Sequence, residues 1–102
     1  MRDIPLSLLR SLAVVHAEGG VRQAAKRLGV EHAAVSRALR DLEAWLGVPL
    51  THERARGTRL RLTPQGRELA DAAMAAIDGL QQATARIREA QSARRVVIAT
   101  PP

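Results

Sequence analysis

Apolar residues recur at helical spacing in three segments before Pro49, and a glycine follows each segment. The first helix is predicted to begin at Pro5 and to end at Gly19 and Gly20. Its apolar face carries Leu6, Leu9, Leu12, Ala13 and His16. A second, shorter helix is predicted from Val21 to the residue before Gly29. Its apolar face includes Ala24 and Ala25, whose small side chains allow another helix to approach closely.

A third apolar stripe predicts a helix over about residues 32–46, closed by Gly47, with Val35, Leu39, Leu42 and Leu46 on the stripe. A turn of three or four residues containing Gly29 joins it to the second helix. This is the helix-turn-helix arrangement, in which the later helix enters the DNA major groove. The opposite face carries short, hydrogen-bonding or basic residues suited to bases and phosphates, namely His32, Ala33, Ser36, Arg37 and Arg40. A helical hairpin in an unrelated bundle remains the alternative.

The periodicity changes beyond Pro49, in the stretch LTHERARGTRLRLT. Alternation from Leu60 to Leu62 predicts strand structure, and Arg54, Arg56 and Arg59 surround Gly57 in a basic loop. We expect a wing of two short strands whose arginines lie along phosphates or enter the minor groove. A charged, solvated hairpin without a partner is the alternative.

A long helix is predicted over about residues 64–93, with Thr63 as N-cap and Pro64 at its first position. Its length of about 45 Å exceeds what a small head covers. Residues repeating at intervals of about four and three, near coiled-coil spacing, form a stripe of Leu69, Ala73, Ile77, Leu80, Thr84 and Ile87. We expect this stripe to form a homodimer interface; folding back on the chain's own head is the alternative.

The last segment, residues 94–102, reads RRVVIATPP. Val96, Val97 and Ile98 favour a strand, but a lone strand is not stable. We therefore expect this segment to begin a further domain that the chain does not contain.

Composition favours a polyanionic partner. The chain has 102 residues, enough for one modest core, and its formal net charge is +6. An arginine-biased genome is an equally good reason for the excess of arginine over lysine. Trp45 is the single aromatic residue, which excludes the aromatic stacking platforms that bind single-stranded nucleic acids.

The absence of cysteine excludes disulfides, thiolate zinc sites and thiol nucleophiles. No apolar run approaches the roughly 20 residues needed to span a bilayer, and the N-terminus lacks a signal-peptide pattern. We expect a cytoplasmic protein.

Three histidines, His16, His32 and His52, raise the question of metal or acid–base chemistry. They lie on three different predicted elements, without a ligand-spaced carboxylate or a plausible nucleophile. We therefore expect no enzymatic activity, no metal and no cofactor. The remaining alternative is a dimerisation or anti-activator module that binds protein, which only Glu31 on the polar face supports. Salt-dependent binding to duplex DNA would distinguish a DNA-binding protein from such a protein-binding module.

The segments AAKRLGV, AAVSRALRDLEAWLGVPL and LTPQGREL resemble the N-terminal domain of LysR-type transcriptional regulators over about residues 4–93. The resemblance implies a mainly α fold, with a winged helix-turn-helix and two-stranded wing in residues 1–63 and a dimerising linker helix in 64–93. It implies that 94–102 begin a C-terminal domain that binds a small-molecule effector, and that dimers associate into tetramers. The implied function is sequence-specific binding of double-stranded operator DNA as a dimer, at an interrupted inverted repeat.

Roles follow from the same resemblance. Ser36 and Arg37 match a Ser-Arg pair that contacts phosphate and base, and Arg22 and Gln23 lie where the family contacts phosphate. His32 and Ala33 stand where Gln and Pro or Ser are usual. Departures from the family pattern are Glu31 in place of Ser, Gly20 in place of Ser, Thr51 in place of Phe, and a wing about two residues longer.

Overall fold

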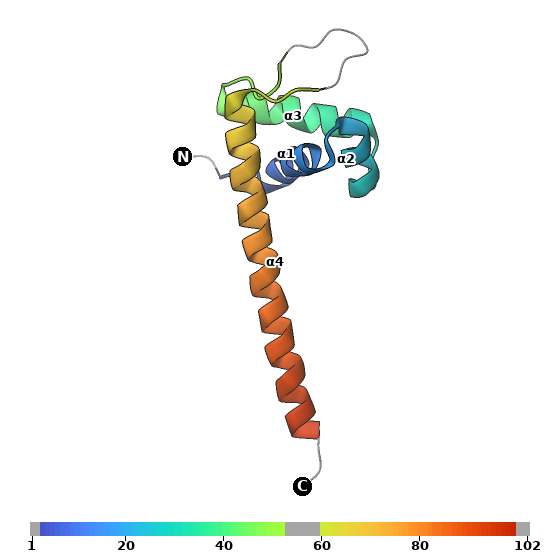
Figure 1. Cartoon of the computed structure of the whole chain (residues 1–102), viewed down its shortest axis with the longest axis vertical. Coiled ribbons are helices and arrows are strands. Elements are labelled where there is room, and N and C mark those ends of the chain that lie inside the picture. Colours follow the sequence, from blue (N-terminus) through green and yellow to red (C-terminus); the bar gives the residue numbers. More distant parts are fainter. Residues whose placement is uncertain (1–2, 53–59, 100–102) are drawn as a thin grey trace.

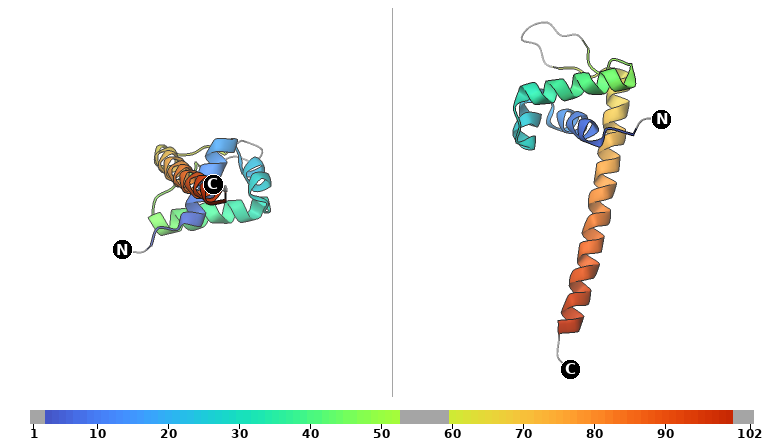
Figure 2. Two further views of the ribbon diagram at one scale, coloured as in Figure 1. Left: turned by 90° about the horizontal axis from the view of Figure 1, so that it is seen from below. Right: turned by 180° about the vertical axis from the view of Figure 1, so that it is seen from behind.

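The computed structural model describes residues 3–52 and 60–99, and helices make up most of this part of the chain (Figure 1). They are α1 (Leu6–Glu18), α2 (Val21–Leu28), α3 (His32–Leu46) and α4 (Pro64–Ala99). Helices α1, α2 and α3 pack against one another as a compact head, and α4 packs against α1 before it leaves the head as a rod (Figures 1 and 2). The fold is mainly helical, as the sequence predicts.

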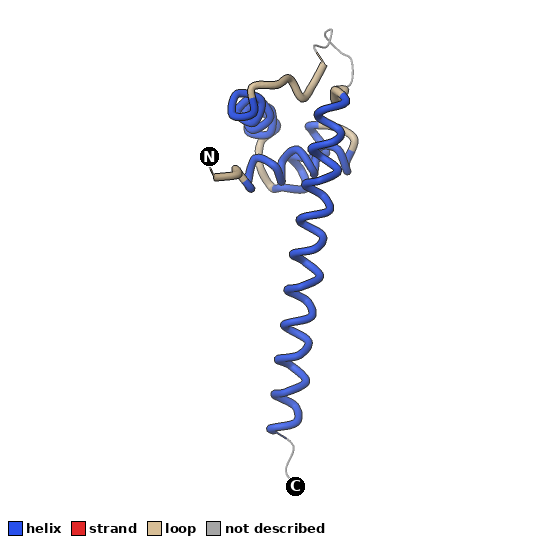
Figure 3. The backbone as a smooth tube through the Cα atoms, turned by 90° about the vertical axis from the view of Figure 1, so that its left-hand side faces the viewer, coloured by secondary structure: helices blue, strands red, loops and turns tan. Residues whose placement is uncertain are grey.

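The rod dominates the shape of the molecule. The principal extents are 69 × 32 × 19 Å, and the radius of gyration is 18.2 Å. A compact domain of this length would have a radius of gyration of about 13 Å. Most of α4 runs clear of the head in a third view as well (Figure 3). Because a 36-residue helix is about 54 Å long, the head covers only its first turns.

A tight turn joins α2 to α3. Gly29 follows α2 with a φ of 72°, in the left-handed region that glycine adopts without a steric penalty. The N–H of Val30 donates to the carbonyl of Ala25 at 3.0 Å, which satisfies a carbonyl at the end of α2. Only Gly29, Val30 and Glu31 separate the two helices, so the predicted helix-turn-helix geometry is confirmed.

The core lies where α1, α2 and α3 meet. Its largest fully buried side chains are Leu12, Leu42, Leu50 and Val35. Ala24 and Ala25 are also buried, so α2 packs closely against the other helices. Leu46 departs from the predicted apolar stripe because it is 40% exposed. As the last residue of α3 it lies beyond the buried part of the helix, beside Val48 at a shallow surface hollow.

The carboxylate of Glu43 connects α3 to the segment that follows it. Its Oε2 atom accepts hydrogen bonds from the backbone N–H groups of Leu50 at 2.8 Å and Thr51 at 3.2 Å. The hydroxyl of Thr51 donates to the same oxygen at 3.4 Å. Charge-assisted hydrogen bonds of this kind are among the stronger ones in proteins, so they fix the chain where it leaves α3.

Thr63 connects the other end of that segment to α4. Its Oγ1 atom accepts a hydrogen bond from the N–H of Gly66 at 3.0 Å, which confirms the predicted N-cap. The same hydroxyl donates to the carbonyl of Pro49 at 3.0 Å, and the N–H of Thr63 donates to the carbonyl of Leu50 at 2.9 Å. The start of α4 is therefore held directly against the chain that leaves α3.

The two segments predicted to form the wing are paired at one point in the described residues. Thr51 and Leu62 form an isolated antiparallel bridge, and the N–H of His52 donates to the carbonyl of Arg61 at 2.8 Å. Within the described ranges no longer strand is formed, and Arg54, Arg56 and Arg59 lie outside them. The segment that contains Thr51 and His52 thus lies antiparallel to the segment that contains Arg61 and Leu62.

Helix α4 differs from the prediction at its end. The sequence predicts a helix to about residue 93 and a strand at Val96–Ile98, but the helix continues to Ala99. The strand prediction is wrong here because a strand requires a neighbouring strand, whereas a helix forms its hydrogen bonds within its own segment. Among the described residues, no helix combines the length and the apolar run required to span a bilayer.

The predicted dimer stripe on α4 is also divided between two environments. Ala73 is buried inside the chain, and Leu69 is partly buried against the core. The side chain of Ala73 is therefore already covered within the chain, which leaves it little surface for contact with a second copy. Leu80 and Ile87, by contrast, are 63% and 69% exposed. The sequence left open that the apolar stripe of the long helix packs against the head of its own chain. In the structure this is so for the first turns of α4 only.

Candidate nucleic-acid interface

The orientation of α3 is set by its buried face. Val35, Leu39 and Leu42 pack into the core, which turns the opposite side of the helix to solvent. The five residues predicted to contact DNA from α3 lie on that side, with His32, Ala33, Arg37 and Arg40 exposed and Ser36 half-buried. Their spacing places them along one strip of the helix. We call these five residues the recognition face.

The start of α2 lies next to the recognition face. Arg22 and Lys26, one helical turn apart on α2, line a shallow hollow of about 340 Å³ together with Glu31, His32 and Ala33. The structure therefore brings Arg22 to the first turn of α3, as a shared interface requires. Lys26 was not predicted as a site residue, although its position four residues after Arg22 was the available signal.

Gln23 is placed differently from Arg22. A Cβ atom on Gly20 would stand 2.7 Å from the Oε1 atom of Gln23, so the glutamine side chain lies over the start of its own helix. Gly20 leaves the room that this arrangement needs. Gln23 remains exposed at the N-terminus of α2, where partial positive charge favours a phosphate group.

Glu31 is an exposed carboxylate at the N-cap of α3. Its backbone is extended, with φ −76° and ψ 149°, and its side chain forms no capping hydrogen bond. The carboxylate repels phosphates, but it is also an acceptor suited to the amino group of cytosine in the major groove. Arg22 and Lys26 line the same hollow and offset its charge.

The basic residues of the recognition face are available for a partner. Within residues 3–52 and 60–99, the ion pairs are Arg27 with Glu18 at 2.9 Å and His16 with Asp71 at 3.2 Å. Arg37 and Arg40 take part in neither pair. An arginine without a carboxylate partner keeps its guanidinium donors for phosphate or for the edge of guanine.

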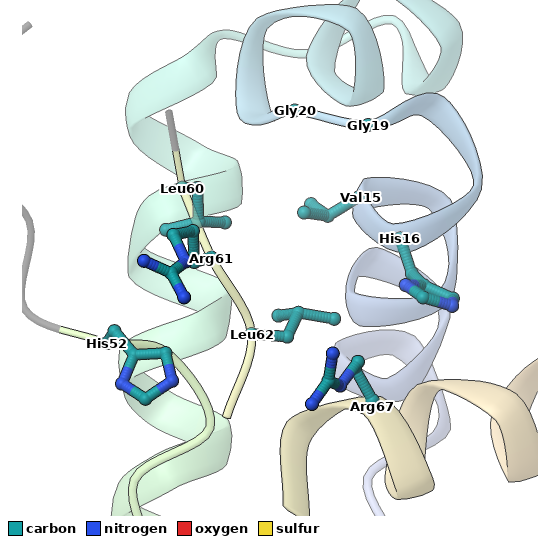
Figure 4. Close-up of a pocket in the computed structure, with 9 residues that line it drawn as sticks. All are labelled: Val15, His16, Gly19, Gly20, His52, Leu60, Arg61, Leu62 and Arg67. Carbon is teal, nitrogen blue, oxygen red and sulfur yellow. The ribbon is translucent and has the colours of Figure 1, made fainter. Parts of the chain in front are cut away.

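A second basic region lies between α1, the segments joined by the bridge of Thr51 and Leu62, and α4. A recess of about 260 Å³ is lined by His16, His52, Arg61 and Arg67, with an apolar surface from Val15, Leu60 and Leu62 (Figure 4). The sequence places His16 and His52 on separate elements, and the structure brings them to one recess. No local sequence signal could have identified this cluster of basic residues, because His16 and Arg67 lie 51 residues apart in the sequence.

The described residues offer no metal centre. No group of three or more His, Cys, Asp and Glu residues in residues 3–52 and 60–99 is arranged to hold an ion. His32 lies on the recognition face, away from the recess that holds the other two histidines.

The distal part of α4 exposes the remainder of the predicted dimer stripe. Leu80, Thr84 and Ile87 are exposed, while Ile77 is partly buried. The hydroxyl of Thr84 donates to the carbonyl of Leu80 at 2.7 Å, which satisfies this polar group within the helix. The surface left to a partner here is therefore largely apolar.

Comparison with known proteins agrees with this architecture. The model of the family described as bacterial regulatory helix-turn-helix protein, lysR family, matches residues 6–67. AhcY transcriptional activator HvrB of Rhodobacter capsulatus is 38% identical over 98 residues, covering 96% of this chain and 33% of the relative. The regulator AbaB of Streptomyces antibioticus is also 38% identical over 98 residues, covering 95% of this chain and 32% of the relative. The chain thus spans about a third of the length of these curated relatives.

Solved structures show the same fold. The DNA-binding domain of BenM in complex with catB site 1 DNA matches with a TM-score of 0.76 and 25% identity, covering 87% of this chain and 97% of that one. OxyR of Corynebacterium glutamicum, as a C206S mutant with bound H2O2, matches with a TM-score of 0.74 and 26% identity, over 88% of this chain and 27% of that one. The family model covers more than half of the sequence and coincides with the head and the start of α4. The chain therefore belongs to the lysR family of bacterial regulatory helix-turn-helix proteins.

Proposed function

We propose that this chain is the DNA-binding and dimerising part of a bacterial transcriptional regulator, and that it binds double-stranded operator DNA sequence-specifically. The observation that carries the proposal is the recognition face of α3, exposed along one strip and backed by buried Val35, Leu39 and Leu42. The similar BenM domain, which forms a DNA complex, supports it.

The recognition face enters the major groove. Arg37 donates two hydrogen bonds to a guanine, and His32 makes a second base contact. Ser36, Arg40, Arg22 and Gln23 bind phosphates on either side, which sets the position of α3 along the duplex. Ala33 is small enough to let the first turn of α3 approach the bases.

The wing contributes a further contact. The bridge between Thr51 and Leu62 supports a two-stranded hairpin with Arg54, Arg56 and Arg59 in its loop. These arginines lie along the backbone or enter the minor groove, where negative potential favours guanidinium groups. Replacing Arg56 with alanine then weakens binding almost uniformly across sequences, whereas a sequence-selective loss would indicate minor-groove recognition.

Two chains pair through the distal part of α4. The exposed side chains of Leu80 and Ile87 supply the apolar contact, and the first turns of α4 hold each head to its rod. Pairing fixes the separation of the two recognition helices, and an inverted repeat is the DNA sequence that matches such a symmetric pair. The bounds of α4, Pro64–Ala99, support a linker helix that continues beyond residue 93.

The complete regulator carries an effector-binding domain after α4, binds a small molecule there and assembles as a tetramer. The share of the curated relatives that this chain spans, about a third, is consistent with such a domain.

The test is fluorescence anisotropy of a labelled duplex pool with random inserts, titrated at two salt concentrations, followed by sequencing of the bound fraction. We expect enrichment of an interrupted inverted repeat and a steep loss of affinity at the higher salt concentration. A folded chain that binds no duplex at low salt would overturn the proposal.

A further inference from the structure

The recess of Figure 4 collects basic side chains from three parts of the fold. His16 comes from α1, His52 and Arg61 come from the two bridged segments at the base of the wing, and Arg67 comes from the first turn of α4. Val15, Leu60 and Leu62 supply its apolar surface. The volume of about 260 Å³ leaves room for a small ionic group.

The charge of this recess is not balanced inside the described chain. Neither Arg61 nor Arg67 forms an ion pair with any residue of the described ranges. The acidic group paired with a member of the recess is Asp71, whose Oδ1 atom lies 3.2 Å from Nε2 of His16. Because like charges gathered at one place repel, a bound anion would stabilise the arrangement.

The position of the recess indicates where that anion comes from. Gly20, which also lines it, is the residue before α2, and exposed Arg22 follows two residues later. On the other side, His52 directly precedes the arginine-rich sequence of residues 53–59 and Leu60 directly follows it. The recess therefore lies between the start of α2 and the base of the wing, two parts of the proposed DNA interface.

We propose that this recess binds one phosphate group of the DNA backbone, with Arg61 and Arg67 as its donors. The inference rests on the proposed function for the source of the phosphate, and it gives the first turn of α4 a direct contact with DNA. Arginine suits this role because its planar donors match the oxygens of a phosphate group.

The anion chemistry is tested first without DNA. The three histidine rings are followed by NMR while inorganic phosphate replaces chloride at constant ionic strength and pH. We expect the resonances of His16 and His52 to shift along one saturable curve, and those of His32, on the recognition face, to stay in place. In the Arg67→Gln protein the His16 and His52 shifts should be lost or much reduced. No shift, or an equal shift of all three rings, overturns the phosphate site.

The source of the phosphate is tested with the operator duplex. Replacing Arg67 with glutamine should reduce the slope of log affinity against log salt concentration by about 0.9 for each bound chain, which is about 1.8 for the proposed dimer. The matched control is Arg86→Gln, which removes the same charge from an exposed distal site on the same helix, outside the hollow that Leu80 and Thr84 line. We expect the control to leave the slope unchanged.

The outcomes separate this inference from the proposed function. Equal slopes for Arg67→Gln, Arg86→Gln and the parent chain overturn the backbone contact, even where free phosphate shifts the histidines. Failure of the parent chain to bind any duplex refutes the proposed function instead, while the phosphate titration still tests the recess. Circular dichroism of both variants establishes that each is folded.

Discussion

Replacing Gly66 with alanine tests how closely α4 is docked against the chain that leaves α3. Gly66 is buried in the first turn of α4. A Cβ atom added there would stand 2.1 Å from the carbonyl oxygen of Leu50, and 3.0 Å from its carbonyl carbon. These are backbone atoms of a fully buried residue, so no side-chain rotation relieves the overlap.

The cost follows from the contacts that must move. Separating α4 from Leu50 strains the hydrogen bond from Thr63 N to the Leu50 carbonyl and the one from Thr63 Oγ1 to the Pro49 carbonyl. Overpacking a core costs about 1–3 kcal/mol, and each buried group left unpaired costs a similar amount. The higher helix propensity of alanine offsets this loss of stability by about 1 kcal/mol. We expect the free energy of unfolding to fall by about 2–4 kcal/mol, which lowers Tm by about 10–20 °C.

Gly79 provides the matched control. It lies on the same helix, and a Cβ atom there would meet nothing within 4 Å. The Gly79→Ala protein should therefore gain about 0.5–1 kcal/mol from helix propensity alone. The measurement is urea and thermal unfolding followed by circular dichroism at one fixed protein concentration, because the proposed dimerisation would make Tm concentration-dependent. Equal stabilisation by both substitutions would refute the close docking of α4 on Leu50.

Three further substitutions test other parts of the molecule. Glu43→Ala removes the acceptor for two backbone N–H groups and should lower the free energy of unfolding by about 1–3 kcal/mol in urea titrations; unchanged stability would show that these bonds contribute nothing. Arg37→Ala should cost about 1–3 kcal/mol of operator affinity and relax one position in each half-site after selection from a random pool; binding equal to the parent chain contradicts the base contact. Ile87→Glu should shift the monomer–dimer equilibrium toward monomer in analytical ultracentrifugation at unchanged helicity, and an unaltered dimer fraction would exclude distal α4 from the interface.

Local signals in the sequence predicted the helices of the head well. Glycines after α1, α2 and α3 end these helices as expected, and Thr63 caps α4 at Pro64. Such signals work because each acts within one helical turn, whatever the rest of the chain does. The recognition face was predictable for the same reason, since helical periodicity alone separates the buried stripe of α3 from its polar side.

The far end of α4 shows the limit of local preference. Val96, Val97 and Ile98 favour strand by residue type, yet they continue the helix. Residue preferences for strand amount to at most about 1 kcal/mol and act mainly through contacts with neighbouring strands. A neighbouring strand is a tertiary feature, which the sequence of one segment does not contain.

The sequence by itself determined the helix-turn-helix, the polar strip of α3 and the start of the long helix. Only the tertiary structure decided that Ala73 packs on the head while Ile87 stays exposed, and that His16 and Arg67 meet at one recess. The physical reason is the range of the interactions. Hydrogen bonds within helices and their caps join residues three or four apart, whereas burial depends on which distant surfaces meet once the helices have formed.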